Sequence, residues 1–241
     1  IRLHPPFVLF VMLLFGWNMV LHYWKGWGSW WLFDVRTFLM NITYTAPFFK
    51  TKWILKIFWT LAVEFQFYIL TGLLYEYLMN DRRWRYALFL AILSIGFLIP
   101  VSYETVFHHY IFFLIGFQSF LKHVGKITWT EFFISLCASL VFIVEVKIVA
   151  AAAVSLVTVA VIFLLQKPLY IGNLLGKISY SLYLTHGMVG GAIAVFTLHW
   201  HEPWWSFVVG LSASIIFAAM YYRWIEKPFM AFSKNRSYRK R

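Results

Sequence analysis

The chain has 241 residues, of which 62% are hydrophobic and 12% are charged, and its formal net charge is +12. Soluble domains are about 45–50% apolar and about 25% charged, so this composition excludes an ordinary soluble domain and predicts an integral membrane protein. The apolar runs are continuous and about 20 residues long, which favours transmembrane helices over the alternating strands of a β-barrel.

Eight stretches are apolar enough to be membrane spans, which predicts an all-α, polytopic helical membrane protein. In chain order they are residues 5–24, 54–79, 84–99, 106–121, 130–146, 148–166, 178–200 and 204–225. Residues 1–228 would form one transmembrane domain and residues 229–241 a basic cytoplasmic tail. The basic residues gather in alternate loops, which predicts that both termini are cytoplasmic.

Membrane topology alone accounts for the positive charge, so we expect no nucleic-acid partner. The single cysteine, Cys137, lies in an apolar run and excludes an intramolecular disulfide. The loop of residues 25–53 breaks the charge alternation, and its apolar centre predicts an interfacial or re-entrant segment rather than a further span.

Polar residues share one face of the second predicted span. Thr60, Glu64, Tyr68 and Thr71 follow spacings of four, four and three residues, which line one side of a helix. Glu64 lies about 12 Å from Lys56 along the helix axis, well inside the membrane. A carboxyl group there indicates either chemistry or a protonated or hydrogen-bonded group that fixes helix packing.

The seventh predicted span carries a second polar face. Ser179, Tyr183 and His186 lie at i, i+4 and i+7, and His186 is about 14 Å beyond Lys177. A neutral histidine here can accept a proton or orient a substrate hydroxyl, or it can be a structural group hydrogen-bonded between helices. The small residues that follow permit close helix packing or leave room for a ligand; they are Gly187, Gly190, Gly191 and Ala194.

Other histidines are weaker candidates. His108 and His109 are adjacent near the external end of their span, so at most one of them faces a common pocket. The turn HWHEP offers His199, His201 and Glu202 to a metal ion, but no further ligands are evident, and we expect no metal site.

The end of the last span contains a charged pair and a proline. Arg223 and Glu226 are three residues apart, which allows them to pair on a helix. Pro228 follows two residues later and is expected to end that helix.

Four stretches, in order along the chain, resemble the membrane acyltransferase 3 family: IRLHPPF, FWTLAVEFQFY, GKISYSLYLTH and YRWIEKPF. The resemblance implies a ten-helix inner-membrane enzyme. Such an enzyme moves an acyl group, commonly acetyl from acetyl-CoA, to a hydroxyl of a carbohydrate such as a surface polysaccharide or a lipid-linked sugar. The implied partners are membrane lipid, acyl-CoA as donor substrate and a carbohydrate acceptor, with no bound cofactor.

By position, the resemblance implies particular residues. Arg2 matches the basic residue before the family's Pro-rich helix entry, and Glu64 matches its intramembrane glutamate. His186 matches the histidine that closes the Ser-Tyr-Leu-Tyr helix, and Glu226 matches the acid of the terminal Glu-x-Pro. Thr60 stands where the family usually has serine. The family's catalytic histidine belongs to a first helix without a counterpart here, so we expect two further N-terminal helices to complete ten.

The resulting hypothesis places acetyl-CoA against cytoplasmic basic residues and the sugar hydroxyl in the polar interior. The basic residues of this rim are Arg2, Arg82, Arg83, Arg85, Lys167 and Lys177. The primary base is expected in the missing N-terminal helices, and Glu64 and His186 are the catalytic-site residues expected in this chain, as lining of the pocket. The expected substrate-binding residues are Arg2, Thr60, Tyr68, Ser179, Tyr183, His109, Arg223 and Glu226. Two alternatives stay open, a transporter or flippase for a lipid-linked sugar and a structural membrane partner.

Overall fold

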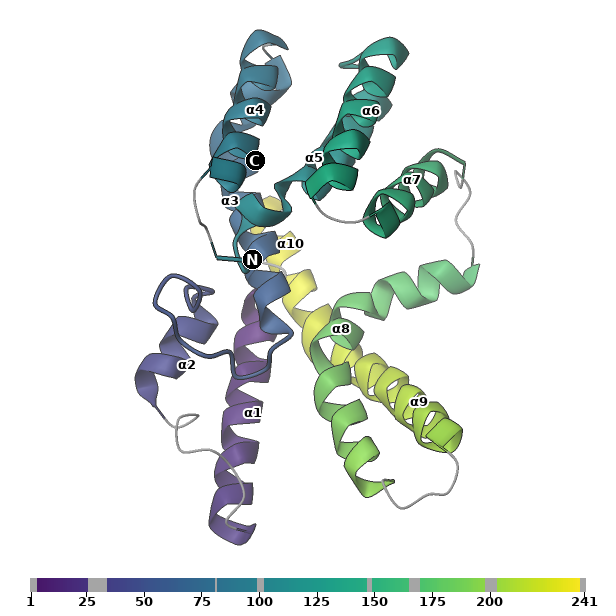
Figure 1. The fold of residues 1–241 in the computed structure, drawn as a ribbon. Coiled ribbons are helices and arrows are strands. Elements are labelled where there is room, and N and C mark those ends of the chain that lie inside the picture. Colours follow the sequence, from purple (N-terminus) through teal and green to yellow (C-terminus); the bar gives the residue numbers. More distant parts are fainter. Residues whose placement is uncertain are drawn as a thin grey trace. The chain divides into compact units, whose positions relative to one another are not determined.

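The computed structural model describes residues 4–25, 34–80, 82–98, 102–146, 149–164, 170–197 and 203–238. Within these ranges, all regular secondary structure is helical. The elements are α1 (His4–Lys25), α2 (Val35–Ile42), α3 (Phe58–Asn80), α4 (Arg82–Leu98), α5 (Val106–His123), α6 (Trp129–Val146), α7 (Val149–Leu164), α8 (Tyr170–Phe196), α9 (Pro203–Tyr221), the π-helical turn η2 (Tyr222–Glu226) and α10 (Lys227–Tyr238) (Figure 1).

The helices belong to two compact units. Unit 1 comprises Ile1–Ala46, Thr51–Ile57 and Pro168–Arg241 and contains α1, α2, α8, α9, η2 and α10. Unit 2 comprises Pro47–Lys50 and Phe58–Lys167 and contains α3 to α7.

The prediction of an all-α fold is confirmed for the described residues, and each predicted span coincides there with a helix. Among the described residues, two helices are long and apolar enough to cross a membrane, Phe58–Asn80 and the continuous helix Trp204–Phe232. Shorter apolar helices cover His4–Val20, Trp84–Ile95 and Val149–Leu164.

Local sequence signals explain where several helices begin and end. At the start of α6, Thr128 Oγ1 accepts from the Glu131 N–H at 3.2 Å, and Glu131 Oε2 accepts from the Thr128 N–H at 2.8 Å, which forms a capping box. At the end of α5, Gly125 has a φ of 72°, a left-handed conformation that glycine adopts without a Cβ clash. At the end of α3, the buried side chain of Arg85 donates from Nε to the Leu78 carbonyl at 2.6 Å.

The segment predicted to be interfacial contains α2. This helix has eight residues, about 12 Å of length, which is too short to cross a hydrocarbon layer of about 30 Å. The Asp34 carboxylate caps it by accepting from the Arg36 and Thr37 backbone N–H groups, each at 3.2 Å. Asn41 is fully buried and joins α2 to the segment before α3, because its Oδ1 accepts from the Ile54 N–H at 2.9 Å.

Helix α8 begins earlier than the predicted span of residues 178–200. It starts at Tyr170, and Figure 1 shows it bent, with a shorter arm at its N-terminal end. In the same unit, α9 lies beside the longer arm of α8 (Figure 1).

The core of unit 2 is made where α3 to α7 pack together. Its buried apolar side chains come from all five helices and include Val63, Phe89, Leu114, Phe132 and Val159. The Gln66 Oε1 accepts from the backbone N–H of Val106 at 2.9 Å, which joins the first half of α3 to the start of α5. These contacts fix the faces of α3 on which the predicted site residues lie.

Candidate functional site

Helix α8 presents a buried face and an exposed face within unit 1. Ser181, Leu184 and Thr185 each have 0% exposure, and their spacing is that of one helical face. Ser179 and His186 are exposed. The polar residues that the sequence grouped on this helix therefore lie away from its buried face.

A buried polar contact joins α8 to the end of the α9 helix. Ser181 Oγ donates to Glu226 Oε2 at 2.7 Å, and Glu226 has 0% exposure. Close by, the Tyr221 hydroxyl donates to the Pro6 carbonyl of α1 at 2.6 Å. The hydrogen bond makes the buried carboxyl group tolerable in the apolar interior. Together the two contacts join α8 to η2 and α9 to α1. Glu226 thus has a packing role in this unit.

Two expectations about this end of the chain are wrong. The described residues contain no ion pair between Arg223 and Glu226, because Arg223 is exposed and Glu226 faces Ser181. The helix also continues through Pro228 as α10. In the preceding π turn the Lys227 N–H bonds to the Tyr222 carbonyl. This i→i+5 bonding changes the angular offset of residues three apart and widens the helix where the proline ring enters.

The imidazole of His186 is oriented by its own helix. Its Nδ1 lies 2.8 Å from the Tyr183 carbonyl and 3.0 Å from the Leu182 carbonyl. A carbonyl oxygen can only accept, so Nδ1 carries the proton in the neutral ring and Nε2 carries the lone pair. Nε2 has no hydrogen-bond partner among the described residues. The exposed nitrogen of His186 is therefore a proton acceptor.

A groove of about 860 Å³ runs along α8 and α9 in unit 1. Ser179, Tyr183 and His186 line it together, as their helical spacing predicted. The complete lining is Leu175, Gly176, Ser179, Leu182, Tyr183, His186, Gly190, Ala194, Ser206, Phe207, Gly210, Leu211 and Ser214.

The groove residues on α9 were not among the predicted site residues. Ser206, Gly210 and Ser214 are four residues apart and line the groove from one face of α9. Gly190 of α8 lies opposite, because a Cβ added to it would be 3.5 Å from Ser214 Oγ. Small residues repeated every four positions permit close helix packing, so this spacing is the signal that could have located the wall.

The hydroxyl groups that line the groove are already hydrogen-bonded. Ser179 Oγ donates to the Gly176 carbonyl at 2.9 Å, and Ser214 Oγ donates to the Gly210 carbonyl at 2.7 Å. The Tyr183 hydroxyl donates to the Ile57 carbonyl at 3.2 Å, and Ser206 bonds to the Thr197 hydroxyl. Their oxygens can still accept a hydrogen bond from a ligand, and His186 Nε2 is the side-chain nitrogen of the lining that can do the same.

Glu64 belongs to unit 2, where α3 carries the other predicted polar face. The Tyr68 hydroxyl donates to Glu64 Oε1 across one helical turn. Thr60 and Glu64 are partly buried, whereas Tyr68 is 52% exposed. Gln66, on a different face of α3, contacts α5, so the Glu64 face is distinct from the face that packs on α5.

His109 lies in an aromatic cluster of unit 2. Its Nε2 donates to the Tyr103 carbonyl at 2.8 Å, and its ring lies 5.3 Å from the Trp59 ring and 5.1 Å from the His108 ring. The proton is therefore on Nε2, the opposite tautomer to that of His186. The two adjacent histidines contact each other and the Tyr103 ring, with His108 4.8 Å from it.

Of the basic residues expected to form a rim, Arg85 is placed elsewhere. It is 4% exposed, and besides Leu78 it contacts the Met79 carbonyl from Nη2 at 3.2 Å. It caps α3, so its expected place on the rim is wrong. Lys177 is exposed on α8. Arg2, Lys167 and the side chains of Arg82 and Arg83 lie outside the described residues.

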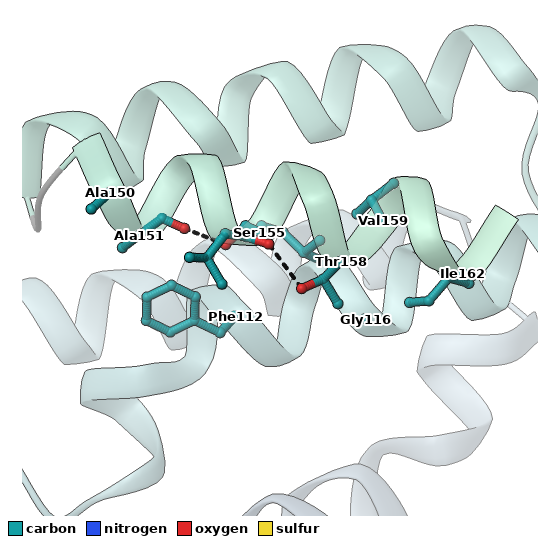
Figure 2. Close-up of a pocket in the computed structure, with 10 residues that line it drawn as sticks. Phe112, Gly116, Ala150, Ala151, Ser155, Thr158, Val159 and Ile162 are labelled. Carbon is teal, nitrogen blue, oxygen red and sulfur yellow. Dashed lines mark hydrogen bonds between the residues drawn. The ribbon is translucent and has the colours of Figure 1, made fainter. Parts of the chain in front are cut away.

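A second groove of about 460 Å³ lies between α5 and α7 in unit 2 (Figure 2). Its two hydroxyl groups bond to their own helix, Ser155 to the Ala151 carbonyl and Thr158 to the Val154 carbonyl, each at 2.8 Å. Figure 2 shows these bonds and the Phe112 ring beside them. Because the lining lacks a titratable side chain, it offers less to chemistry than the groove of unit 1.

No group of three or more His, Cys, Asp or Glu side chains in the described ranges could hold a metal ion. The HWHEP residues His199, His201 and Glu202 lie outside those ranges. Comparison with protein-family models, with curated proteins and with solved structures finds no match to this chain.

Proposed function

We propose that the chain is part of a multi-pass membrane O-acyltransferase that moves an acyl group, in the simplest case acetyl, from acyl-CoA to a carbohydrate hydroxyl. The apolar composition and the two helices long enough to cross a membrane support a membrane location. The four stretches that resemble the acyltransferase 3 family support the reaction. In this proposal the remaining apolar helices also span the membrane, and both termini are cytoplasmic.

The observation that carries the proposal is the orientation of His186. Its Nδ1–H is held by backbone carbonyls, and its Nε2 lone pair is available in a groove with small-residue walls. A general base needs a lone pair within hydrogen-bond reach of the proton that it removes. A histidine whose other nitrogen is already fixed meets that requirement without a further partner.

The proposed step uses Nε2 of His186 as the acceptor for the carbohydrate hydroxyl. As the hydroxyl oxygen attacks the thioester carbonyl carbon, its proton moves to Nε2. The carbon–sulfur bond then breaks, and the thiolate of coenzyme A leaves and takes that proton. The products are the O-acyl ester and free coenzyme A, and the imidazole returns to its neutral form.

Glu64 is proposed to assist through its bond to Tyr68. A carboxyl group that accepts from a phenol one helical turn away is held in one orientation. This makes the Glu64–Tyr68 pair a second polar group for which the proposal predicts a functional effect, independent of the His186 groove.

The test supplies labelled acetyl-CoA to membranes that contain the full-length protein and measures label in glycan. His186→Ala should reduce transfer by at least 100-fold, in the range attributed to a general base, and Glu64→Gln should also reduce it. Ser94→Ala is the matched control, because that exposed hydroxyl of α4 donates to the Leu90 carbonyl of its own helix and lines neither groove.

Unchanged transfer in His186→Ala and Glu64→Gln would reject the proposed residues. If the wild-type protein transfers no label to any glycan but moves a labelled lipid-linked sugar across the bilayer, the chain is a flippase and the acyltransferase proposal is wrong.

A further inference from the structure

We infer that the junction of η2 and α10 binds the headgroup of an anionic phospholipid, with the lipid phosphate at Arg223 and Lys227 and the top of its chains at Trp224. This property goes beyond the proposed reaction and rests on the proposed function only for the membrane location of the chain. Lipid binding and acyl transfer are separate measurements, so either one can fail alone.

The site lies near one end of the continuous helix Trp204–Phe232, which is long and apolar enough to cross a membrane. Trp204, at the start of this helix, is 75% exposed, and Trp224 is 67% exposed. The helix rises about 29 Å from Trp204 to Arg223 at 1.5 Å per residue, close to the hydrocarbon thickness of about 30 Å. Tryptophan favours both membrane–water interfaces, so this spacing places Arg223 and Trp224 at the level of the lipid headgroups.

Two cations are exposed at this level, and the fold removes the neighbouring acid from their surface. Arg223 and Lys227 are both exposed and lie about one helical turn apart. Glu226 is the only Asp or Glu in residues 223–241, which contain seven Lys and Arg residues. It is fully buried and accepts from Ser181 Oγ at 2.7 Å. The exposed face therefore keeps its positive charge, which complements an anionic headgroup.

An exposed apolar track leads along the same helix to the two cations. Its side chains are Ile216, Met220 and Trp224, which follow each other at intervals of four residues and are all exposed. Arg223 comes three residues after Met220, which puts it on the same side of the helix. A soluble anion would leave this track bare, whereas a phospholipid covers it with an acyl chain while its phosphate meets the guanidinium and the ammonium. A lipid is therefore the ligand that fits both parts of the surface.

The experiment uses the full-length protein in nanodiscs of phosphatidylcholine. Two photoactivatable probes, a phosphatidylglycerol and a phosphatidylcholine with the same diazirine-bearing chain, are added to separate samples. Mass spectrometry then quantifies labelled peptides from residues 212–232. Each cation is expected to favour the anionic lipid about fivefold, so phosphatidylglycerol should label this segment about 25-fold more than phosphatidylcholine. Arg223→Gln and Lys227→Gln should each lower that ratio about fivefold.

The matched control is Lys126→Gln, which removes one positive charge from an exposed lysine of unit 2, in the turn between α5 and α6. That variant should leave the ratio unchanged. Coenzyme A, added in solution to the wild type, is the competitor that represents a soluble phosphate, and it should not reduce labelling by phosphatidylglycerol. Arg223 and Lys227 are exposed, so their replacement should leave folding intact, and either variant alone suffices for the comparison.

Equal labelling by the two lipids in the wild type would overturn the inference. An equal fall of the ratio in Lys126→Gln would overturn it too, because the preference would then reflect the total charge of the protein. Competition by coenzyme A would assign the two cations to the acyl donor and reject a lipid site. A protein that keeps the lipid preference but transfers no acyl group would reject the proposed function alone, whereas transfer without the preference would reject the lipid site alone.

Discussion

The buried contact between Ser181 and Glu226 makes a sharp prediction about stability. Ser181→Ala removes the hydroxyl that donates to Glu226 Oε2 at 2.7 Å, at a place where both residues have 0% exposure. The change adds no bulk and lies within a helix, where alanine is favourable. The expected effect therefore comes from the lost hydrogen bond alone.

The magnitude follows from burial. Removing the donor of a buried hydrogen bond to a carboxyl group lowers the free energy of unfolding by about 1–3 kcal/mol. For a chain of this size, each kcal/mol corresponds to roughly 2–4 °C in Tm. Ser179→Ala is the matched control two residues away, because its hydroxyl is exposed and bonds to the Gly176 carbonyl of the same helix. That variant should unfold at nearly the wild-type temperature.

The assay is thermal unfolding of the purified protein in detergent, with both variants and the wild type measured side by side. Ser181→Ala should unfold several degrees below Ser179→Ala. Equal melting temperatures for the two variants would refute the reasoning, because they would mean that the contact with Glu226 does not hold α8 in place.

Three further predictions concern other buried or capping groups. Arg85→Ala should lower the free energy of unfolding by about 3 kcal/mol, because the guanidinium donates to two carbonyls at the end of α3. Arg85→Lys should lower it by less, since the ammonium keeps the charge but reaches the two carbonyls less well. Chemical denaturation of the two variants and the wild type measures both differences. Asn41→Ala should speed protease cleavage around α2, because this fully buried amide bonds to the Thr37 backbone before the turn and to the Lys52 and Ile54 backbone after it. An unchanged cleavage rate would contradict that role. The backbone hydrogen bond from the Arg36 N–H, with those from Thr37, lowers the pKa of Asp34 below its ordinary 3.8, so its contribution to α2 is full above that pH and is lost as the pH falls through the lowered pKa. Amide NMR shifts of α2 should follow this titration in the wild type and stay flat in Asp34→Asn, which caps without titrating.

The sequence predicted the helices well because their signals are local. A long apolar run is a signal within one stretch of chain, and the ends of α5 and α6 agree with the expectation to within two residues. The face shared by Ser179, Tyr183 and His186 was also predictable, because helical spacing alone determines it.

Contacts between distant parts of the chain were not predictable in this way. Glu226 was expected to pair with its near neighbour Arg223, but the actual partner, Ser181, is 45 residues away. Arg85 was read as a surface charge because its loop is basic, whereas it turns back onto the carbonyls at the end of α3. Neither partner can be found from spacing along one helix, since both depend on how helices pack.

The expectation that the last helix ends at Pro228 was also wrong, and the reason lies in the turn just before the proline. Pro228 normally ends a helix because it lacks an N–H and its ring meets the preceding turn. The π turn before it relieves both restrictions, and the chain continues as a helix to Tyr238. Nothing in the stretch YRWIEKPF distinguishes a stopped helix from one that widens by one residue.

The central claim is that neutral His186 carries its proton on Nδ1 and offers Nε2 to the groove. Nitrogen-15 NMR of the full-length protein in nanodiscs measures this directly, with the His186 signals identified by their loss in His186→Gln. The account predicts a protonated Nδ1 and an unprotonated Nε2 in the neutral ring. A protonated Nε2 in the neutral ring would contradict it.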